Sequence, residues 1–170
     1  MVQLILVILS MLMIASYTTA LCVKGKCVPN SISATFYKLE HKLWFLATMW
    51  LTAGFLIYPM VEINPDMAGF AFLAVFGMIL VGAAPNFEET YEGKIHAAGA
   101  VACIVGSQVW VASVLPEALY AWILCAVYFG VDMLDSEGKF GERFMACKPM
   151  FWIEIVALLT TYTSCLKSFL

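Results

Sequence analysis

Few residues of this chain could carry chemistry, and Glu154 is the most unusual of them. It lies about one helical turn into an apolar stretch and two residues after Trp152. An ionisable side chain inside such a stretch is costly, and by default it indicates a functional site. A glutamate near a helix start can also reach a polar surface and interact favourably with the helix dipole. Glu154 is therefore either a functional carboxylate or a solvated one.

A second group of polar residues surrounds His96. Glu92 lies four residues before it, so the two side chains share one face if a helix extends that far, and Glu88 and Glu89 precede them. Carboxylates with an imidazole can bind a divalent metal or relay protons. The chain has only two histidines and no HExxH motif, which favours a structural histidine. We therefore expect no bound metal or other cofactor. His96 and Glu92 are the residues that would hold a metal, and with Glu154 they are the candidates for catalysis.

The segment 29–37 is uncharged, rich in hydroxyl groups and ends in aromatic residues. A nucleophilic Ser31 or Ser33 would need a neighbouring base. The segment has neither a nucleophile elbow nor an S-x-x-K motif. We therefore expect a loop at the membrane interface, in which Ser31, Ser33 and Tyr37, together with Glu88, are candidates for binding.

Gln108 is a further candidate for binding. At 1.5 Å per residue it lies about 18 Å further along the same predicted helix than His96. An amide at that depth in a membrane needs a hydrogen-bonding partner. Bonding to a neighbouring helix is the usual role of such a residue, and lining a pore is the alternative.

The elements that position these residues follow from composition. The chain has 170 residues, of which 63% are hydrophobic and 12% charged, and its mean hydropathy is +0.91. A soluble domain averages about 45–50% apolar and about 25% charged residues, so a lipid bilayer is the expected surrounding. The net charge of −3 and the lack of a basic cluster exclude nucleic acid as a partner.

Six stretches are long and apolar enough to span a bilayer, which takes about 17–25 residues. We predict an all-α transmembrane bundle that forms a single domain over residues 1–170. The first stretch lacks the basic start of a signal peptide and is expected to remain as an anchor helix. The predicted spans are 2–22, 43–61, 67–84, 95–115, 118–134 and 150–166.

Basic residues indicate the orientation, because Lys and Arg in short loops mark the cytoplasmic side. They lie in the first, third and fifth connections and are absent from the second and fourth. We therefore predict that the odd-numbered loops are cytoplasmic and that both termini lie outside, with Lys167 as the one basic residue on the outer side.

Small residues predict which helices pack closely. Ala98, Ala102 and Gly106 recur at four-residue spacing in the fourth predicted span. Such a stripe allows two helix backbones to approach each other in lipid. The third span, with Gly69, Gly77 and Gly82, is expected to make a similar contact.

Six cysteines are scattered along the chain, and three of them fall inside predicted spans. Cys22 and Cys27 are close enough to form a disulfide, but one such pair is a poor indicator. Free thiols are the expected state, since a buried cysteine behaves as a small hydrophobic residue.

Two short motifs carry a resemblance. The chain reads Ser-Ile-Ser-Ala-Thr-Phe-Tyr over residues 31–37 and Trp-Ile-Glu over residues 152–154. In this pattern it resembles small, uncharacterised proteins of bacteria and their phages that have about six transmembrane spans. The resemblance implies a bacterial inner membrane as the location, and no activity.

These observations leave three functions open. The favoured one is a non-enzymatic channel, carrier or oligomeric scaffold. This function is compatible with a homo-oligomer. An intramembrane enzyme would act on lipid headgroups at the cytoplasmic interface through His96 and the nearby carboxylates. A lipid or ion sensor would use the 31–37 loop.

Overall fold

The computed structural model describes residues 1–135 and 139–170, and every regular element within them is a helix. Four short helices lie in the connections. These are the 3-10 helices η1 (Ser33–Lys38), η2 (Pro65–Met67) and η3 (Pro116–Leu119) and the α-helix α6 (Phe140–Ala146). The six long helices are α1 (Val2–Gly25), α2 (Leu43–Ile63), α3 (Ala68–Ala83), α4 (Thr90–Val114), α5 (Tyr120–Asp135) and α7 (Pro149–Phe169).

All six long helices are apolar enough to cross a membrane, with η2 and η3 extending α3 and α5 at their starts. The predicted all-α bundle is confirmed, and the helices identify an integral membrane protein. Some helices are longer than the apolar stretches that predicted them. α4 begins at Thr90 instead of residue 95, because backbone hydrogen bonds continue a helix through polar residues such as Glu92 and Lys94.

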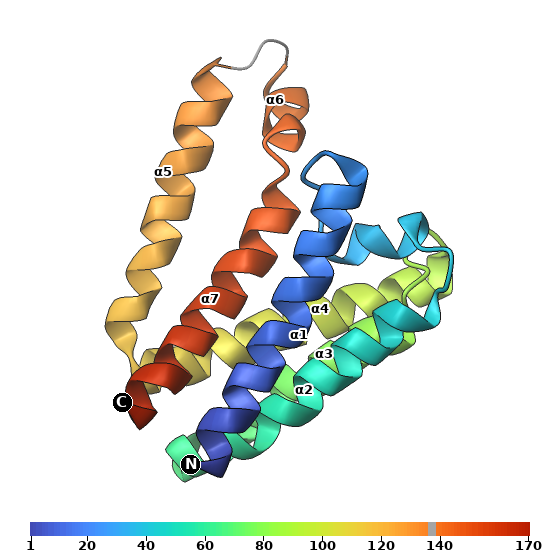
Figure 1. Cartoon of the computed structure of the whole chain (residues 1–170). Coiled ribbons are helices and arrows are strands. Elements are labelled where there is room, and N and C mark those ends of the chain that lie inside the picture. Colours follow the sequence, from blue (N-terminus) through green and yellow to red (C-terminus); the bar gives the residue numbers. More distant parts are fainter. Residues whose placement is uncertain (136–138) are drawn as a thin grey trace.

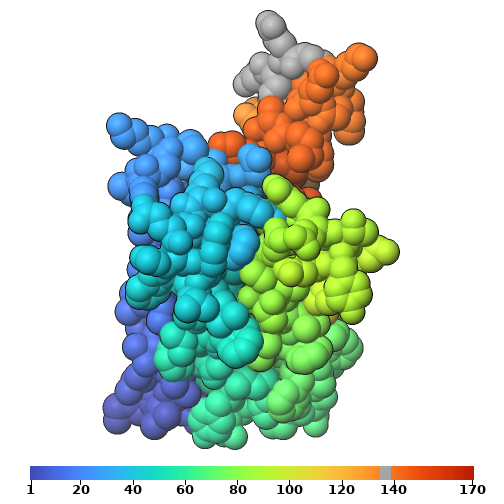
Figure 2. All heavy atoms as spheres, turned by 90° about the vertical axis from the view of Figure 1, so that its right-hand side faces the viewer, coloured from blue at the N-terminus to red at the C-terminus, as the bar shows by residue number. Residues whose placement is uncertain are grey.

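The helices α1, α2, α3, α4 and α7 form the body of the bundle, and α5 stands on the outer side of α7 (Figure 1). Both termini lie at the same end (Figure 1). The short helix α6 projects beyond the opposite end of the bundle (Figure 2). It lies in the fifth connection, where the sequence analysis predicted no helix.

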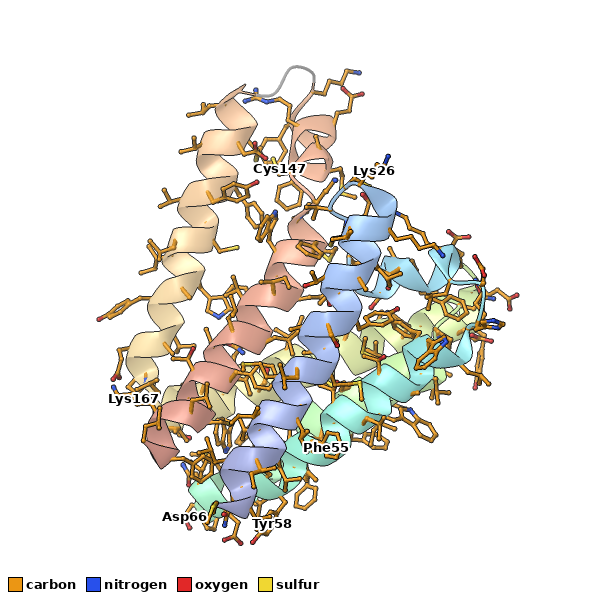
Figure 3. The ribbon with its side chains drawn as sticks, in the orientation of Figure 1. Lys26, Phe55, Tyr58, Asp66, Cys147 and Lys167 are labelled. Carbon is orange, nitrogen blue, oxygen red and sulfur yellow. The ribbon has the colours of Figure 1, made fainter. Side chains whose placement is uncertain are left out.

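The two ends of the bundle differ in charge. Lys26 and Cys147 lie at one end, whereas Asp66 and Lys167 lie at the other (Figure 3). The first, third and fifth connections, with the helix turns beside them, contain eight of the nine Lys and Arg residues of the chain: Lys24, Lys26, Lys38, Lys42, Lys94, Lys139, Arg143 and Lys148. Because successive long helices run in opposite directions, these eight basic residues gather at one end of the bundle.

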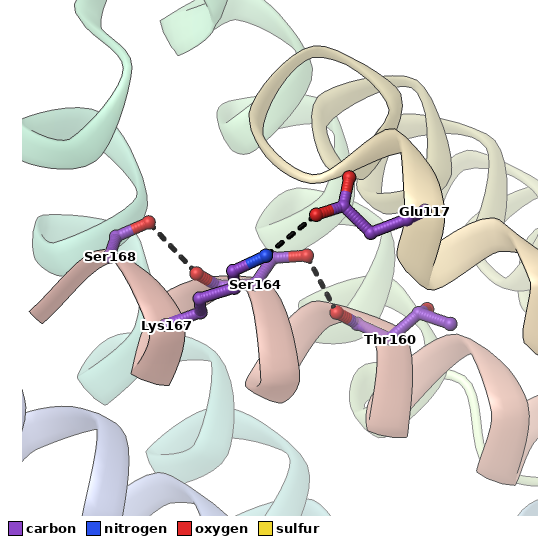
Figure 4. A network of polar contacts seen from close by, with 5 residues as sticks. All are labelled: Glu117, Thr160, Ser164, Lys167 and Ser168. Atoms are coloured by element: carbon purple, nitrogen blue, oxygen red, sulfur yellow. Dashed lines mark hydrogen bonds and ion pairs between the residues drawn. The ribbon is translucent and has the colours of Figure 1, made fainter. Parts of the chain in front are cut away.

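The remaining basic residue, Lys167, has an acidic neighbour. Its Nζ lies 2.6 Å from Oε1 of Glu117, which joins the last turn of α7 to η3 (Figure 4). On the same face of α7, the Ser164 hydroxyl donates to the Thr160 carbonyl at 2.8 Å and the Ser168 hydroxyl to the Ser164 carbonyl at 2.9 Å. Both ion-pair side chains are more than half exposed, so the pair contributes less than about 1 kcal/mol where it faces water.

The closest packing in the bundle joins α3 to α4 through glycines. A Cβ atom on Gly77 would lie 2.4 Å from the Cys103 backbone nitrogen, and one on Gly106 would lie 2.6 Å from the Ala74 nitrogen. A Cβ atom on Gly99 would likewise lie 2.9 Å from the Gly77 carbonyl oxygen. These contacts bring the two backbones together, as small residues permit in membrane helices.

The predicted stripe on this helix was only partly right. Gly106 lies in the contact, but Ala98 is exposed and Ala102 is half-buried. The line of contact with α3 runs through Gly99, Cys103 and Gly106 instead. A helix has 3.6 residues per turn, so steps of four and then three follow one face, whereas repeated steps of four drift around the axis. On α3, Gly77 makes the expected close contact and Gly69 meets open space.

Hydrogen bonds between helices accompany this packing. The fully buried Trp110 indole on α4 donates to the Met60 carbonyl of α2 at 3.2 Å. The Ser10 hydroxyl on α1 donates to the Thr52 carbonyl of α2 at 2.9 Å and lies 2.8 Å from the Tyr162 hydroxyl of α7. In lipid such bonds add specificity to packing that the hydrophobic effect does not drive.

Candidate functional site

The carboxylate of Glu154 reaches from α7 to the hydroxyl-rich segment between α1 and α2. Its Oε2 accepts a hydrogen bond from the backbone N–H of Ile32, and its Oε1 accepts one from the Ser33 hydroxyl at 3.2 Å. Both donors lie at the start of η1. Glu154 is partly buried, so a set of protein donors replaces some of the water that an exposed carboxylate would have.

Two further contacts hold this segment against the start of α7. The Phe151 N–H donates to the Asn30 carbonyl at 3.1 Å, and the Lys148 ammonium donates to the Val28 carbonyl. Pro149 occupies the first position of α7, where its missing N–H and fixed φ suit a helix start. The position of Glu154 is therefore determined from both sides, by its own helix and by the segment that it contacts.

The hydroxyl groups of the segment bond to protein neighbours. The Ser31 hydroxyl accepts a hydrogen bond from the Ala34 N–H at 2.8 Å, and the Thr35 hydroxyl lies 2.7 Å from the Tyr17 hydroxyl of α1. Tyr37 donates to Oδ1 of Asn86 at 3.2 Å and accepts from the Glu88 N–H at 2.9 Å. These bonds connect the segment to α1 and to the connection before α4.

A cavity of about 90 Å³ lies between α1, α2, α3, α4 and α7, with Glu154 and Ser33 in its wall. Most of the remaining wall consists of apolar side chains, including those of Met49, Leu56, Val75, Met78, Ile104 and Leu158. Cys103, Ser107 and Thr161 add weakly polar groups. One water molecule needs roughly 10–15 Å³ of such space, so the cavity has room for about six to nine.

Two of the helices that line the cavity, α4 and α7, lie at an angle to each other (Figure 1). A hydrogen bond joins them where the Gln108 amide, toward the carboxyl end of α4, donates to the Ala157 carbonyl near the middle of α7 at 3.3 Å. They separate toward their amino ends, where Glu154 is found (Figure 1). The charged group of the cavity, Glu154, lies in the amino-terminal half of α7.

Gln108 joins three helices. Its Oε1 accepts hydrogen bonds from the Trp122 indole of α5 at 2.9 Å and from the Thr160 hydroxyl of α7 at 3.0 Å. Its Nε2 donates to the Ser107 hydroxyl at 3.2 Å as well as to Ala157. Of the two roles considered for this amide, interhelical hydrogen bonding is the one observed.

His96 is buried and bonds within its own part of the chain. Its Nδ1 lies 2.9 Å from the Ala84 carbonyl oxygen, and its ring lies 5.0 Å from the Phe87 ring. The Glu92 carboxylate accepts from the Asn86 N–H at 3.2 Å. Both side chains therefore order the connection between α3 and α4, and neither lies in the wall of the cavity.

The three candidates for catalysis thus have separate neighbours: Glu154 contacts the 31–37 segment, Glu92 contacts Asn86, and His96 contacts Ala84. Across residues 1–135 and 139–170, no three His, Cys, Asp or Glu side chains come together in a group suited to a metal ion. All six cysteines lie in these ranges and are free, Cys22 and Cys27 included.

Several residues of the site were not predicted. Asn86 and Trp122 are the partners of Tyr37 and Gln108, and Cys103, Ser107 and Thr161 line the cavity. Their residue types are common in apolar helices and turns, so the sequence contains no signal that separates them from their neighbours. Trp122, one turn from the start of its helix, resembles an ordinary aromatic residue at the membrane interface.

The chain matches no protein-family model, no curated protein and no solved structure. The resemblance to small six-span proteins of bacteria and phages therefore stays a prediction. The structure nevertheless relates the two motifs that carry it, since Ile32 and Ser33 of the first motif donate to Glu154 of the second.

Proposed function

We propose that this protein is a non-enzymatic carrier that binds a small solute in the cavity between its helices. The observation that carries the proposal is the 90 Å³ cavity, which has apolar walls and one carboxylate. Binding sites for small molecules typically combine mostly apolar walls with a few polar groups that orient the ligand.

The contacts of the candidate catalytic residues favour a carrier over an enzyme. General acid–base or nucleophilic chemistry needs reacting groups within hydrogen-bonding reach of one another. His96 and Glu92 are engaged with Ala84 and Asn86, away from the cavity that Glu154 lines. The same contacts favour a structural role for the 31–37 segment over lipid or ion sensing, because its hydroxyl groups bond to other protein groups.

The proposed orientation places the basic end of the bundle in the cytoplasm and both termini outside. It is supported by the clustering of basic residues around the first, third and fifth connections. Glu154 then lies toward the cytoplasmic end of the cavity. The resemblance described above supports the inner membrane of a bacterium as the location.

Equilibrium dialysis of the protein in lipid nanodiscs tests the proposal, with empty nanodiscs as the blank. The probes are radiolabelled n-butylammonium, 1-butanol and butyrate, which match the cavity in size and differ in charge. We expect at least one to bind at about one molecule per chain. The probe that binds should also enter proteoliposomes faster than protein-free liposomes. If no probe binds, or if binding occurs without uptake, the carrier proposal is wrong.

A cavity-filling variant locates the binding. Ala157 lies in the cavity wall, and Ala157→Leu would place three additional carbon atoms in the space. Ala126→Leu is the matched control, because Ala126 is exposed on α5. We expect A157L to lose binding and A126L to retain it. Equal binding by both variants would show that the probe occupies another place.

A further inference from the structure

Glu154 is the only charged residue in the wall of the cavity, as far as the described residues show. Its two oxygens accept hydrogen bonds from the Ile32 N–H and the Ser33 hydroxyl. An ionised carboxylate has about four acceptor positions. It can therefore accept further hydrogen bonds from a ligand in the cavity while it keeps both of these contacts.

No basic side chain neutralises this carboxylate within the described ranges. The two ion pairs found there are Lys24–Glu40 and Lys167–Glu117. Lys148 is the nearest basic residue in the chain, and its ammonium donates to the Val28 carbonyl. A carboxylate removed from water without a counter-charge is unfavourable. A cation in the cavity would supply that counter-charge.

The walls define the rest of the ligand. Side chains such as Met49, Leu56, Met78 and Leu158 offer an apolar surface that suits a hydrocarbon group. A bare metal ion would need several oxygen ligands. The side-chain oxygens in the wall are those of the Glu154 carboxylate and of three hydroxyl groups, on Ser33, Ser107 and Thr161. The Thr161 hydroxyl already bonds to the Ala157 carbonyl at 2.8 Å.

From these observations we infer that the cavity binds a small organic monocation, with its ammonium group against the Glu154 carboxylate and its hydrocarbon group among the apolar side chains. This inference rests on the proposed function and names the class of solute. If each non-hydrogen atom takes roughly the space of one water molecule, the cavity has room for about six to nine of them. Alkylammonium ions of four or five carbon atoms fit this description.

A purely structural role for Glu154 makes a different prediction. Its carboxylate also caps the start of η1, and that contact would exist without any ligand. A structural carboxylate would leave the cavity indifferent to the charge of a solute. The test must therefore separate loss of charge from loss of the cap.

Two variants make this separation. Glu154→Gln removes the charge but keeps a carbonyl oxygen that can accept from the Ile32 N–H. Ser33→Ala removes one hydrogen bond of the cap and keeps the charge. Binding of labelled n-butylammonium and of the uncharged 1-butanol is measured for the wild-type protein and both variants in lipid nanodiscs.

We expect the wild-type protein to bind n-butylammonium at least about tenfold more tightly than 1-butanol, because hydrogen bonds to charged groups contribute roughly 1.5–3 kcal/mol. E154Q should lose this preference and still bind 1-butanol, whereas S33A should retain the preference. The selectivity of the wild-type protein tests the inference even if E154Q fails to fold.

The inference is overturned if the wild-type protein binds both probes equally, or if E154Q retains the preference for the cation. In either case, if A157L abolishes the binding, the proposal that the cavity binds a solute still holds. Absence of binding by every probe would instead overturn the proposed function itself. The two failures are thus distinguishable.

Discussion

The backbone N–H of Ile32 donates a hydrogen bond to the carboxylate of Glu154, which lies 122 residues further along the chain. This bond connects the segment between α1 and α2 to the start of the last helix. It also determines which way the carboxylate points, beside a cavity that five helices enclose. The most unusual residue of the sequence is thus part of both the folding contacts and the candidate site.

Truncation of Glu154 should destabilise the fold. Glu154→Ala leaves the Ile32 N–H and the Ser33 hydroxyl without their acceptor. Leaving a buried donor unsatisfied lowers the free energy of unfolding by about 1–3 kcal/mol. We expect a lower midpoint of thermal unfolding in detergent. Glu40→Ala is the control, because the Glu40 side chain is 80% exposed and its ion pair with Lys24 contributes little. Equal midpoints for the two variants would contradict a structural contribution from Glu154.

Replacement of Gln108 should loosen α5. Gln108→Leu removes the acceptor for Trp122 and for Thr160, which connect α4 to α5 and to α7. Interhelical bonds of this kind contribute about 0.6–2 kcal/mol each in membranes. Cys125 on α5 is buried, so we expect its alkylation by a maleimide to become faster, as measured by mass spectrometry of the peptide that contains it.

The exposed neighbour Val109 provides the control for this experiment. Val109→Leu changes an apolar side chain that is 36% exposed and has no hydrogen-bonding group. Alkylation of Cys125 should stay at the wild-type rate in V109L. An unchanged rate in Q108L as well would show that other contacts hold α5 in place.

The glycines of α3 should differ sharply in their tolerance of alanine. A Cβ atom at Gly77 would lie within 2.5 Å of the Gly99 carbonyl oxygen, which is backbone and cannot move aside cheaply. We expect Gly77→Ala to destabilise by about 1–3 kcal/mol or more through overpacking. Gly69→Ala on the same helix meets open space and should be neutral or slightly stabilising, because alanine favours helix more than glycine does. Chemical unfolding in mixed micelles compares the two, and similar losses would contradict the close approach of α3 and α4.

The two ends of the bundle should face opposite sides of the membrane. Cys27 is exposed in the first connection, at the basic end. A cysteine introduced by Asp66→Cys in a chain without its native cysteines would lie at the other end (Figure 3). We expect a membrane-impermeant maleimide to label D66C in intact cells and Cys27 only after permeabilisation. The reverse pattern would invert the proposed orientation, and labelling of both in intact cells would contradict the opposite placement of the two ends.

The class of fold and the approximate helix bounds could be predicted from the sequence alone. Apolar stretches long enough for a bilayer have few alternatives to a helix, since a backbone in lipid must satisfy its own hydrogen bonds. This constraint is local, so residues such as 43–61 predict a helix without knowledge of their neighbours. Polar residues that interrupt these stretches, Glu154 and Gln108 among them, could be singled out for the same reason.

The contacts of these residues depend on how the helices pack in three dimensions. One of the two donors to Glu154 is the backbone N–H of Ile32. Every residue except proline has such a group, so the residue type does not reveal this contact. The face of α4 that contacts α3 depends on how the two helices cross, which is why Gly99 and Cys103 replaced Ala98 and Ala102 in the contact. The cavity is lined by side chains from five helices and from the 31–37 segment, so it depends on packing across the whole bundle.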